Sequence, residues 1–256
     1  MTVGVVLLEP SVQPGSARSW VADQPRLTVV PAGAFGETVG WVRSAELDHV
    51  VVASRAAVAD EARLLGTVLA GALPDLAVAV RSADTTSVAL ATAAAVALEG
   101  AEGPVRTLEI LTHLLEHSAS GVWLSSVTRL EHPKPTFTQH LRSIVSRGYV
   151  AWLSPEAVVR RDGTGVPEDV DVLTGCAEGE APLDALRALV PGDRVHPVPA
   201  VADVRAVYGS PGAEFVTLAR LPTAGPDVAQ CPVCRIVQPG IVCPFCQVHL
   251  RVPERT

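Results

Sequence analysis

The stretch DHVVVAS, residues 48–54, is mostly apolar and shows no alternation of polar and apolar residues. Three similar runs occur in the first hundred residues: VGVVLLE (3–9), RLTVVPA (26–32) and LAVAVRS (76–82). Short valine-rich runs of this kind are typical of parallel strands that are buried on both faces. We therefore expect all four runs to be buried parallel strands.

Segments with helical spacing of their apolar residues lie between and after these runs. They are SARSWVAD (16–23), AFGETVGWVRSA (34–45), AAVADEARLLGTVLAGAL (56–73) and TTSVALATAAAVALEG (85–100). The alternation of strands and helices favours an open parallel α/β sandwich, Rossmann-like or receiver-like, over residues 1–100. The glycine-containing stretch EGAEGP that follows is typical of a linker.

Composition limits the class of protein. The chain has 256 residues, enough for more than one domain, and its hydrophobic fraction of 48% is ample for packed cores. The net charge of -7 argues against a general affinity for polyanions. The start MTVGVVLLEP has no basic region of the kind that opens a signal peptide, and VALATAAAVALEG is too short to span a bilayer. We therefore expect a cytoplasmic protein with no membrane partner.

The pattern changes from strand-helix alternation to mainly helical after residue 104. VRTLEILTHLLEH (105–117) places leucines on one helical stripe, VWLSSVTRL (122–130) has apolar residues at helical spacing, and KPTFTQHLRSIVSRG (134–148) does so again. YVAWLS (149–154) and AVVRRDG (157–163) then predict two strands joined by a turn. This order of three helices and a hairpin is the layout of a winged helix-turn-helix domain.

The stretch VWLSSVTRLEHPKPTFTQHLRSIVSRGYV resembles the winged-helix domain of IclR-like and MarR-like bacterial transcription regulators. The resemblance covers residues 105–162 and implies that the third helix enters the major groove while the wing meets phosphates. Between Arg106 and Arg161 seven Arg or Lys face four Glu, so this part of the chain is locally basic. The residues that the resemblance assigns to DNA binding are Lys134, Thr136, Thr138, Gln139, Arg142, Arg147, Arg160 and Arg161.

The stretch CPVCRIVQPGIVCPFC holds two CxxC pairs separated by eight residues. Each pair can form a turn that presents two thiolates to one ion, and two such turns make a tetrahedral sulfur site with no open position. We therefore expect a structural Zn²⁺ in a short zinc ribbon spanning residues 227–256. Iron fits the same sulfurs, and two disulfides are a further alternative. The expected ligands are Cys231, Cys234, Cys243 and Cys246.

Signals for catalysis are weak. The chain has no GxGxxG, no GxxxxGK[ST] and no GxSxG motif. The third strand ends in Ser54 and Arg55 rather than in the aspartate that a phosphorylatable receiver domain needs. Gly15 and Ser16 precede a helix and could hold an anion, although an ordinary turn is the simpler interpretation. His113 and His117 have metal-compatible spacing but are more simply a polar helix edge. We therefore expect that the chain has no catalytic residues and is not an enzyme.

These observations lead to a functional hypothesis. The chain is expected to be a DNA-binding transcriptional regulator with an α/β sensing or dimerisation domain, a central winged helix, a small α/β or β-rich segment (163–226) and a structural zinc ribbon. Its expected partners are DNA and a protein or second copy. One alternative is a non-catalytic scaffold that uses the winged helix and ribbon for protein contacts. Another is an enzyme with a nucleotide-type site at the carboxyl ends of the parallel strands.

Overall fold

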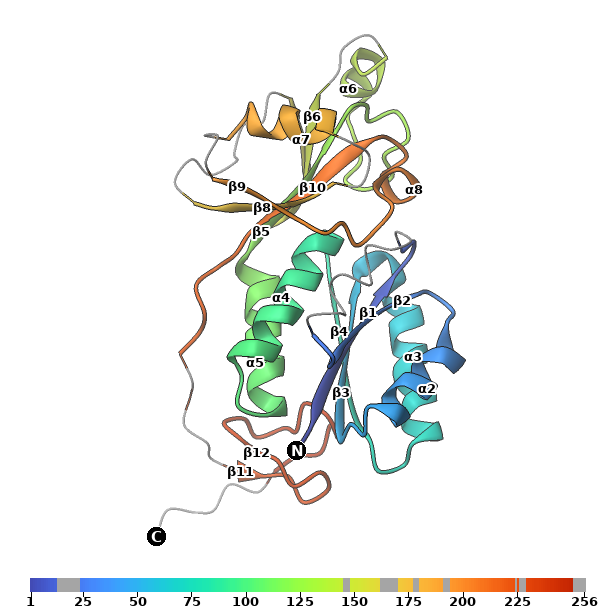
Figure 1. Cartoon of the computed structure of the whole chain (residues 1–256), viewed down its shortest axis with the longest axis vertical. Coiled ribbons are helices and arrows are strands. Elements are labelled where there is room, and N and C mark those ends of the chain that lie inside the picture. The colour runs from blue at the N-terminus through green and yellow to red at the C-terminus, as the bar shows by residue number, and fades with distance from the viewer. Residues whose placement is uncertain are drawn as a thin grey trace.

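The computed structural model comprises a four-stranded, a six-stranded and a two-stranded sheet with their covering helices (Figure 1). The structure describes residues 1–12, 24–144, 148–161, 170–176, 180–190, 194–223, 225 and 229–250. The helix expected over 16–23, including Ser16, and the turn residue Gly15 lie outside these ranges. Within them, no helix is both long and apolar enough to cross a bilayer.

The first sheet is parallel throughout. It consists of β1 (Val3–Glu9), β2 (Leu27–Pro31), β3 (His49–Arg55) and β4 (Ala77–Ala83) in the order β2-β1-β3-β4. The central strands β1 and β3 are buried along their whole length, which is why their sequences lack polar alternation. The expected mixed α/β fold with a parallel sheet is confirmed.

Helices cover both faces of this sheet (Figure 1). α2 (Phe35–Ser44) and α3 (Ala59–Ala72), the latter preceded by the short helix η1 (Ala56–Val58), pack on one face. α4 (Ser87–Gly100) and α5 (Pro104–His117) pack on the other. α4 also contacts the second sheet, so it is buried on nearly all sides and needs no polar face.

The second sheet is mostly antiparallel, has the order β7-β6-β5-β10-β8-β9 and is parallel only between β8 and β9. It lies beyond the carboxyl ends of the parallel strands (Figure 1). Its strands are β5 (Ala119–Leu124), β6 (Tyr149–Ser154), β7 (Val158–Arg161), β8 (Val172–Gly175), β9 (Val195–Val198) and β10 (Gly212–Thr217), and its helices are α7 (Glu180–Arg187) and α8 (Val204–Tyr208).

The prediction of a winged helix is wrong, and β5 is the first reason. VWLSSVTRL, expected as the second helix, begins inside this strand and pairs with β6 and β10. Val122 and Leu124 pack in the cluster that contains α8, whereas Trp123 packs in the cluster on the α7 side. This alternation is the period of a strand. α5, expected as the first helix of the same domain, packs against the parallel sheet instead.

The expected recognition helix also differs from the prediction. α6 (Phe137–Arg142) has six residues, none of them buried, and Phe137 and Ile144 are 78% and 68% exposed. A recognition helix needs an apolar face that packs on the other helices of its domain, and α6 has no such contact among the described residues. The strands expected as a wing exist as β6 and β7, but they form one edge of the six-stranded sheet. Residues 105–162 are therefore not a winged-helix unit.

Two residues assigned to DNA contact are engaged within the chain. Thr136 and Gln139 form a capping box, in which each side chain accepts a hydrogen bond from the other's backbone N–H. Gln139 Nε2 also donates to the carbonyl of Val159 at 2.8 Å. Gln139, which the resemblance assigned to DNA binding, is thus used to start α6 and to attach it to β7.

The remaining members of that set are distributed over several elements. Arg160 on β7 lies 4.0 Å from Glu156. Arg147 lies outside the described residues. The others are exposed on the loop before α6, on α6 or at the end of β7: Lys134, Thr138, Arg142 and Arg161.

Gly209 ends α8 in the left-handed region, with φ at 75°. A Cβ there would lie 2.4 Å from the Cβ of Arg129 and 3.0 Å from its carbonyl oxygen. Gly209→Ala should therefore lower the free energy of unfolding by about 2–4 kcal/mol, combining left-handed strain with overpacking. Gly71→Ala, in α3 with open space around it, is the control and should leave stability unchanged or slightly higher. Urea unfolding measures both, and equal stabilities would contradict the tight packing of Gly209.

Candidate functional site

Five polar side chains meet where the carboxyl ends of the parallel strands face the second sheet. Glu9 and Arg55 end the two central strands, Ser87 begins α4, and Tyr208 and Glu214 come from α8 and β10. All five are buried. We call this group the junction cluster. Its position follows the general rule that ligands of parallel α/β sheets bind beyond the carboxyl ends of the strands.

Glu214 joins the second sheet to the start of α4. Its Oε1 accepts from the backbone N–H of Ser87 at 3.1 Å and from the hydroxyl of Tyr208 at 2.7 Å. Its Oε2 accepts from the backbone N–H of Val88 at 3.0 Å. A carboxylate at the amino end of a helix is stabilised by the free N–H groups and by the helix dipole. A side chain from β10 therefore fills the anion position of α4.

Arg55 supplies a buried positive charge. Its Nε donates to the carbonyl of Thr85 at 3.1 Å, and its guanidinium lies 4.9 Å from the ring centre of Tyr208. Burial opposes the charge, but Tyr208, Glu214 and other acidic neighbours outweigh it and raise the pKa of Arg55. Its Nη1 is buried and has no hydrogen-bond partner among the described residues. Arg55 is thus a charged donor with an unused N–H group.

Glu9 is the neutral member of the junction cluster. It is fully buried, and its Oε2 accepts from the hydroxyl of Ser87 at 2.7 Å. Burial raises the pKa of Glu9 to about 8, with Arg55 opposing the rise and Glu214 adding to it. At neutral pH the side chain is therefore mostly protonated. Its Oε1 is buried without a hydrogen-bond partner in the described part of the chain.

Further hydroxyl groups lie next to the junction cluster, at the carboxyl edge of the parallel sheet. Ser54 Oγ lies 2.8 Å from Ser82 Oγ, and Thr85 Oγ1 lies 2.9 Å from Ser120 Oγ at the start of the second sheet. Buried polar groups without partners are uncommon because each costs the free energy of lost hydration. The two unused atoms of Glu9 and Arg55 are therefore what distinguishes this polar cluster from a fully satisfied one.

The sequence pointed to only part of the junction cluster. Arg55 stands beside Ser54 at the polar end of the third strand, which lacks the aspartate of a phosphorylatable receiver domain. Glu9 ends an otherwise apolar run in the same way. Glu214 was missed, and its signal was a single glutamate within the apolar strand GAEFVT.

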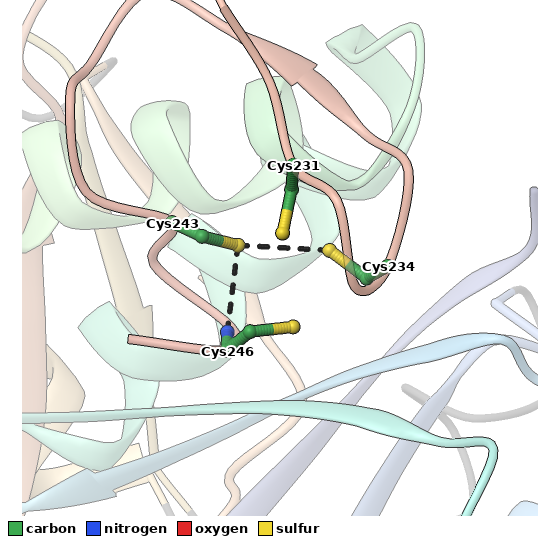
Figure 2. A group of neighbouring side chains, drawn as sticks. All are labelled: Cys231, Cys234, Cys243 and Cys246. Carbon is green, nitrogen blue, oxygen red and sulfur yellow. Dashed lines mark hydrogen bonds between the residues drawn. The ribbon is translucent and has the colours of Figure 1, made fainter. Parts of the chain in front are cut away.

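A second candidate site lies in the segment from 229 to 250, which we call the Cys segment. It contains the short strands β11 (Ala229–Gln230) and β12 (Val237–Gln238) and lies beside the N-terminus, at the opposite end of the parallel sheet (Figure 1). The Sγ atoms of Cys231, Cys234, Cys243 and Cys246 all lie within 4.8 Å of one another. Figure 2 shows the four sulfurs directed toward a common centre.

The Cys segment repeats one local structure twice. Cys231 N–H donates to the carbonyl of Ile236 at 2.8 Å, and Cys243 N–H donates to that of Val248 at 2.9 Å. The residue after the second cysteine of each pair has a positive φ, at 61° for Arg235 and 55° for Gln247. Two turns of the same form therefore bring the two CxxC pairs together.

The protonation of these thiols limits what the cluster can do alone. Burial opposes ionisation of Cys231, but N–H groups of Cys234 and Val233 bond to its sulfur and lower its pKa to about 7. Burial raises the pKa of Cys234 and Cys246. Without a cation among them, the four sulfurs do not all become thiolates at neutral pH.

The histidine pair is a helix edge rather than a metal site. The rings of His113 and His117 stack with centroids 4.2 Å apart. His113 Nε2 lies 3.0 Å from the carbonyl of Arg220, and His117 Nδ1 lies 3.0 Å from the carbonyl of His113. In the ranges that the structure covers, the four cysteines are the group whose ligand atoms are arranged to share an ion.

No protein-family model matches the chain, and no curated protein matches it. Its fold is similar to that of a DegV family protein from Corynebacterium glutamicum, with 15% identity, a TM-score of 0.58, and coverage of 87% of this chain and 99% of that one. It is also similar to that of a fatty acid binding DegV family protein from Streptococcus agalactiae, with 10% identity, a TM-score of 0.54, and coverage of 86% of this chain and 99% of that one. A third similar fold is that of the dihydroxyacetone kinase of C. freundii, with 11% identity, a TM-score of 0.52, and coverage of 86% of this chain and 48% of that one.

These likenesses show a shared fold, and that fold is not a winged helix combined with a zinc ribbon. The resemblance to IclR-like and MarR-like regulators is therefore wrong, because the segment that carried it forms part of a six-stranded sheet. The prediction of a DNA-binding regulator with DNA as its main partner fails with it. The scaffold and nucleotide-enzyme alternatives gain no support from these neighbours.

Proposed function

We propose that the chain binds the carboxyl group of a fatty acid or similar acyl ligand at the junction cluster. The observation that carries the proposal is a pair of buried atoms, Arg55 Nη1 and Glu9 Oε1, that have no hydrogen-bond partner among the described residues and lie beyond the carboxyl ends of the parallel strands. The similarity in fold to a protein described as fatty acid binding supports the choice of ligand class. The proposed role is binding and not catalysis.

The charges of the junction cluster suit a carboxylate. Arg55 would donate from Nη1 to one ligand oxygen as a charged donor, which is the stronger kind of hydrogen bond. Protonated Glu9 has a proton to donate from Oε1, because its Oε2 already accepts from Ser87. Glu214 accepts from the N–H groups of Ser87 and Val88, and the Thr86 hydroxyl accepts from that of Ala89, so the proposed ligand relies on Arg55 and Glu9.

The pH dependence of binding gives a specific test. Glu9 is neutral below its pKa of about 8 and negative above it, so raising the pH places a second negative charge beside the ligand carboxylate. Oleate affinity of the wild type should fall by up to about tenfold per pH unit above pH 8. Glu9→Gln keeps a neutral donor at every pH, so its affinity should stay flat from pH 6 to pH 9.

The experiment is calorimetric titration of the full chain with sodium oleate, below its micellar concentration, across this pH range. Glu37→Gln, which changes an exposed glutamate on α2, is the matched control and should follow the wild type. Arg55→Met should weaken binding by about 10- to 100-fold, as expected for loss of a hydrogen bond to a charged group. Circular dichroism checks that this variant is folded.

A buried water molecule could satisfy the same two atoms. In that case oleate would not bind, or it would bind with an affinity that neither Glu9→Gln nor pH changes. Either result would overturn the proposal. Oleyl alcohol, which lacks the carboxylate, serves as the ligand control and should bind much more weakly than oleate.

A further inference from the structure

We infer that Cys231, Cys234, Cys243 and Cys246 bind one Zn²⁺ ion, and that this ion fixes the Cys segment over the amino ends of the parallel strands. The inference is independent of the proposed ligand site, which lies at the opposite ends of those strands. It begins from the arrangement in Figure 2, where four sulfurs from two turns surround one position.

The sulfur distances fit an ion better than disulfides. Four sulfurs placed about 2.3 Å from a central zinc are about 3.8 Å apart in a regular tetrahedron. Cys234 Sγ and Cys243 Sγ lie 3.6 Å apart, close to that value. A disulfide requires about 2.05 Å, and the four cysteines are free thiols. This contact also joins cysteines of different CxxC pairs, as expected when both turns bind one ion.

The backbone supports the sulfurs as a metal site requires. The N–H of Cys246 points to the sulfur of Cys243 at 3.4 Å, and N–H groups of Val233 and Cys234 bond to Cys231. Hydrogen bonds of this kind stabilise thiolates around a metal and hold them in position. The two turns repeat the same backbone bonds, with a positive φ at the same position, so the geometry is built twice by two separate stretches of sequence.

The Cys segment has little regular secondary structure of its own. Its strands β11 and β12 have two residues each. Several of its apolar side chains remain outside any core, with Val233, Ile241 and Val237 exposed by 63%, 58% and 48%. A unit of this size rarely folds on its own apolar contacts, and structural zinc supplies the missing free energy in small metal-bound domains.

The buried part of the Cys segment rests on the body of the protein. Ile236, Phe245 and Leu250 belong to the same core cluster as Val3 and Leu98 of the α/β unit. The Phe245 ring meets His49, the first residue of β3, edge-on with centroids 5.1 Å apart. The ion would therefore hold an apolar cover over the amino ends of β1 and β3.

The same segment forms one wall of a cavity of about 480 Å³. The opposite wall is α5, where the guanidinium of Arg106 donates to the carbonyl of Pro222, a residue that precedes the Cys segment in the chain. Loss of the ion would therefore free the Cys-segment side of the cavity, together with the apolar side chains that cover the amino ends of β1 and β3. The lining includes Leu108, Thr112 and Glu116 from α5 and Gln238, Gly240 and Val242 from the Cys segment.

The test is elemental analysis of the full chain purified without a metal-chelating tag. The wild type should contain one zinc per chain, and Cys243→Ser should lose it. Cys176→Ser is the matched control, because Cys176 lies in the second sheet region and its Sγ contacts the carbonyl of Gly212. That variant should keep its zinc. Replacement by Co²⁺ should give the visible bands of a tetrahedral thiolate site.

Hydrogen exchange on the wild type avoids any folding defect of the variants. Removing the metal with a chelator should expose amides in residues 229–250, while β1 and β3 stay protected. Three results would overturn the inference: a metal-free protein whose Cys segment is still protected, disulfides found by mass spectrometry under non-reducing conditions, or iron in place of zinc.

Discussion

Glu214→Gln should lower the free energy of unfolding by about 3–5 kcal/mol, the cost of leaving a buried charge without its partner. The glutamine has one acceptor oxygen where Glu214 has two, so Ser87 N–H, Val88 N–H and the Tyr208 hydroxyl can no longer all be satisfied. It also removes the negative charge beside Arg55, which stays protonated and buried. Urea unfolding at pH 7 measures the loss.

Two further variants show how much of the loss in stability comes from the buried charge of Glu214. Tyr208→Phe removes one donor but keeps the ring under Arg55, and should cost about 2 kcal/mol. Glu109→Gln, in the partly exposed pair with Arg106, should cost less than about 1 kcal/mol. If Glu214→Gln were no more destabilising than Tyr208→Phe, Glu214 would not be the counter-charge of Arg55.

Glu9→Gln should raise stability at pH 8 by several kcal/mol and remove much of the pH dependence of folding. The folded pKa of Glu9, about 8, lies above its ordinary value of 4.5. A group with a raised folded pKa contributes stability that is complete below the unfolded pKa and is lost as the pH rises through the folded pKa. Wild-type stability should therefore fall by about 1.4 kcal/mol per pH unit between pH 4.5 and pH 8 from this residue.

The measurement is urea unfolding of the wild type and Glu9→Gln at pH 5, 6, 7 and 8. The difference between the two curves isolates Glu9, because every other titrating group is common to both. Glu37→Gln, at an exposed position of α2, should give a curve parallel to the wild type. Parallel curves for Glu9→Gln would mean that Glu9 is ionised in the folded protein throughout this range.

The parallel sheet was predictable because its signal is local. Each of the four strands is a short apolar run, and burial on both faces leaves a pattern that the run itself carries. The approach of the four sulfurs was predictable for the same reason, since each CxxC forms its own turn. The metal that they would hold remains a prediction.

The second sheet was not predictable because its pairing is distant. In VWLSSVTRL the spacing of Trp123, Val127 and Leu130 fits a helix, while Val122 and Leu124 fit one face of a strand. Residues 122–124 form a strand because they pair with β10, in which Gly212 lies opposite Leu124. Local spacing contains no information about a partner that far along the chain.

The junction cluster escaped prediction for a related reason. Glu9 and Arg55 each resemble an ordinary polar end of a strand, and nothing near them in the sequence indicates burial. Their burial comes from the second sheet, which covers the carboxyl edge. Such sites are found from tertiary packing rather than from motifs.

The cap on α4 has a consequence for the order of events as the chain emerges during synthesis. Ser87 and its acceptor Glu214 are separated by 127 residues. All four parallel strands and α4 are complete long before Glu214 is made, and early segments generally begin to fold first. Until then the N–H groups of Ser87 and Val88 lack the acceptor that they have in the finished fold. The arrival of β10 therefore closes a long loop and joins the second sheet to α4 in one late step.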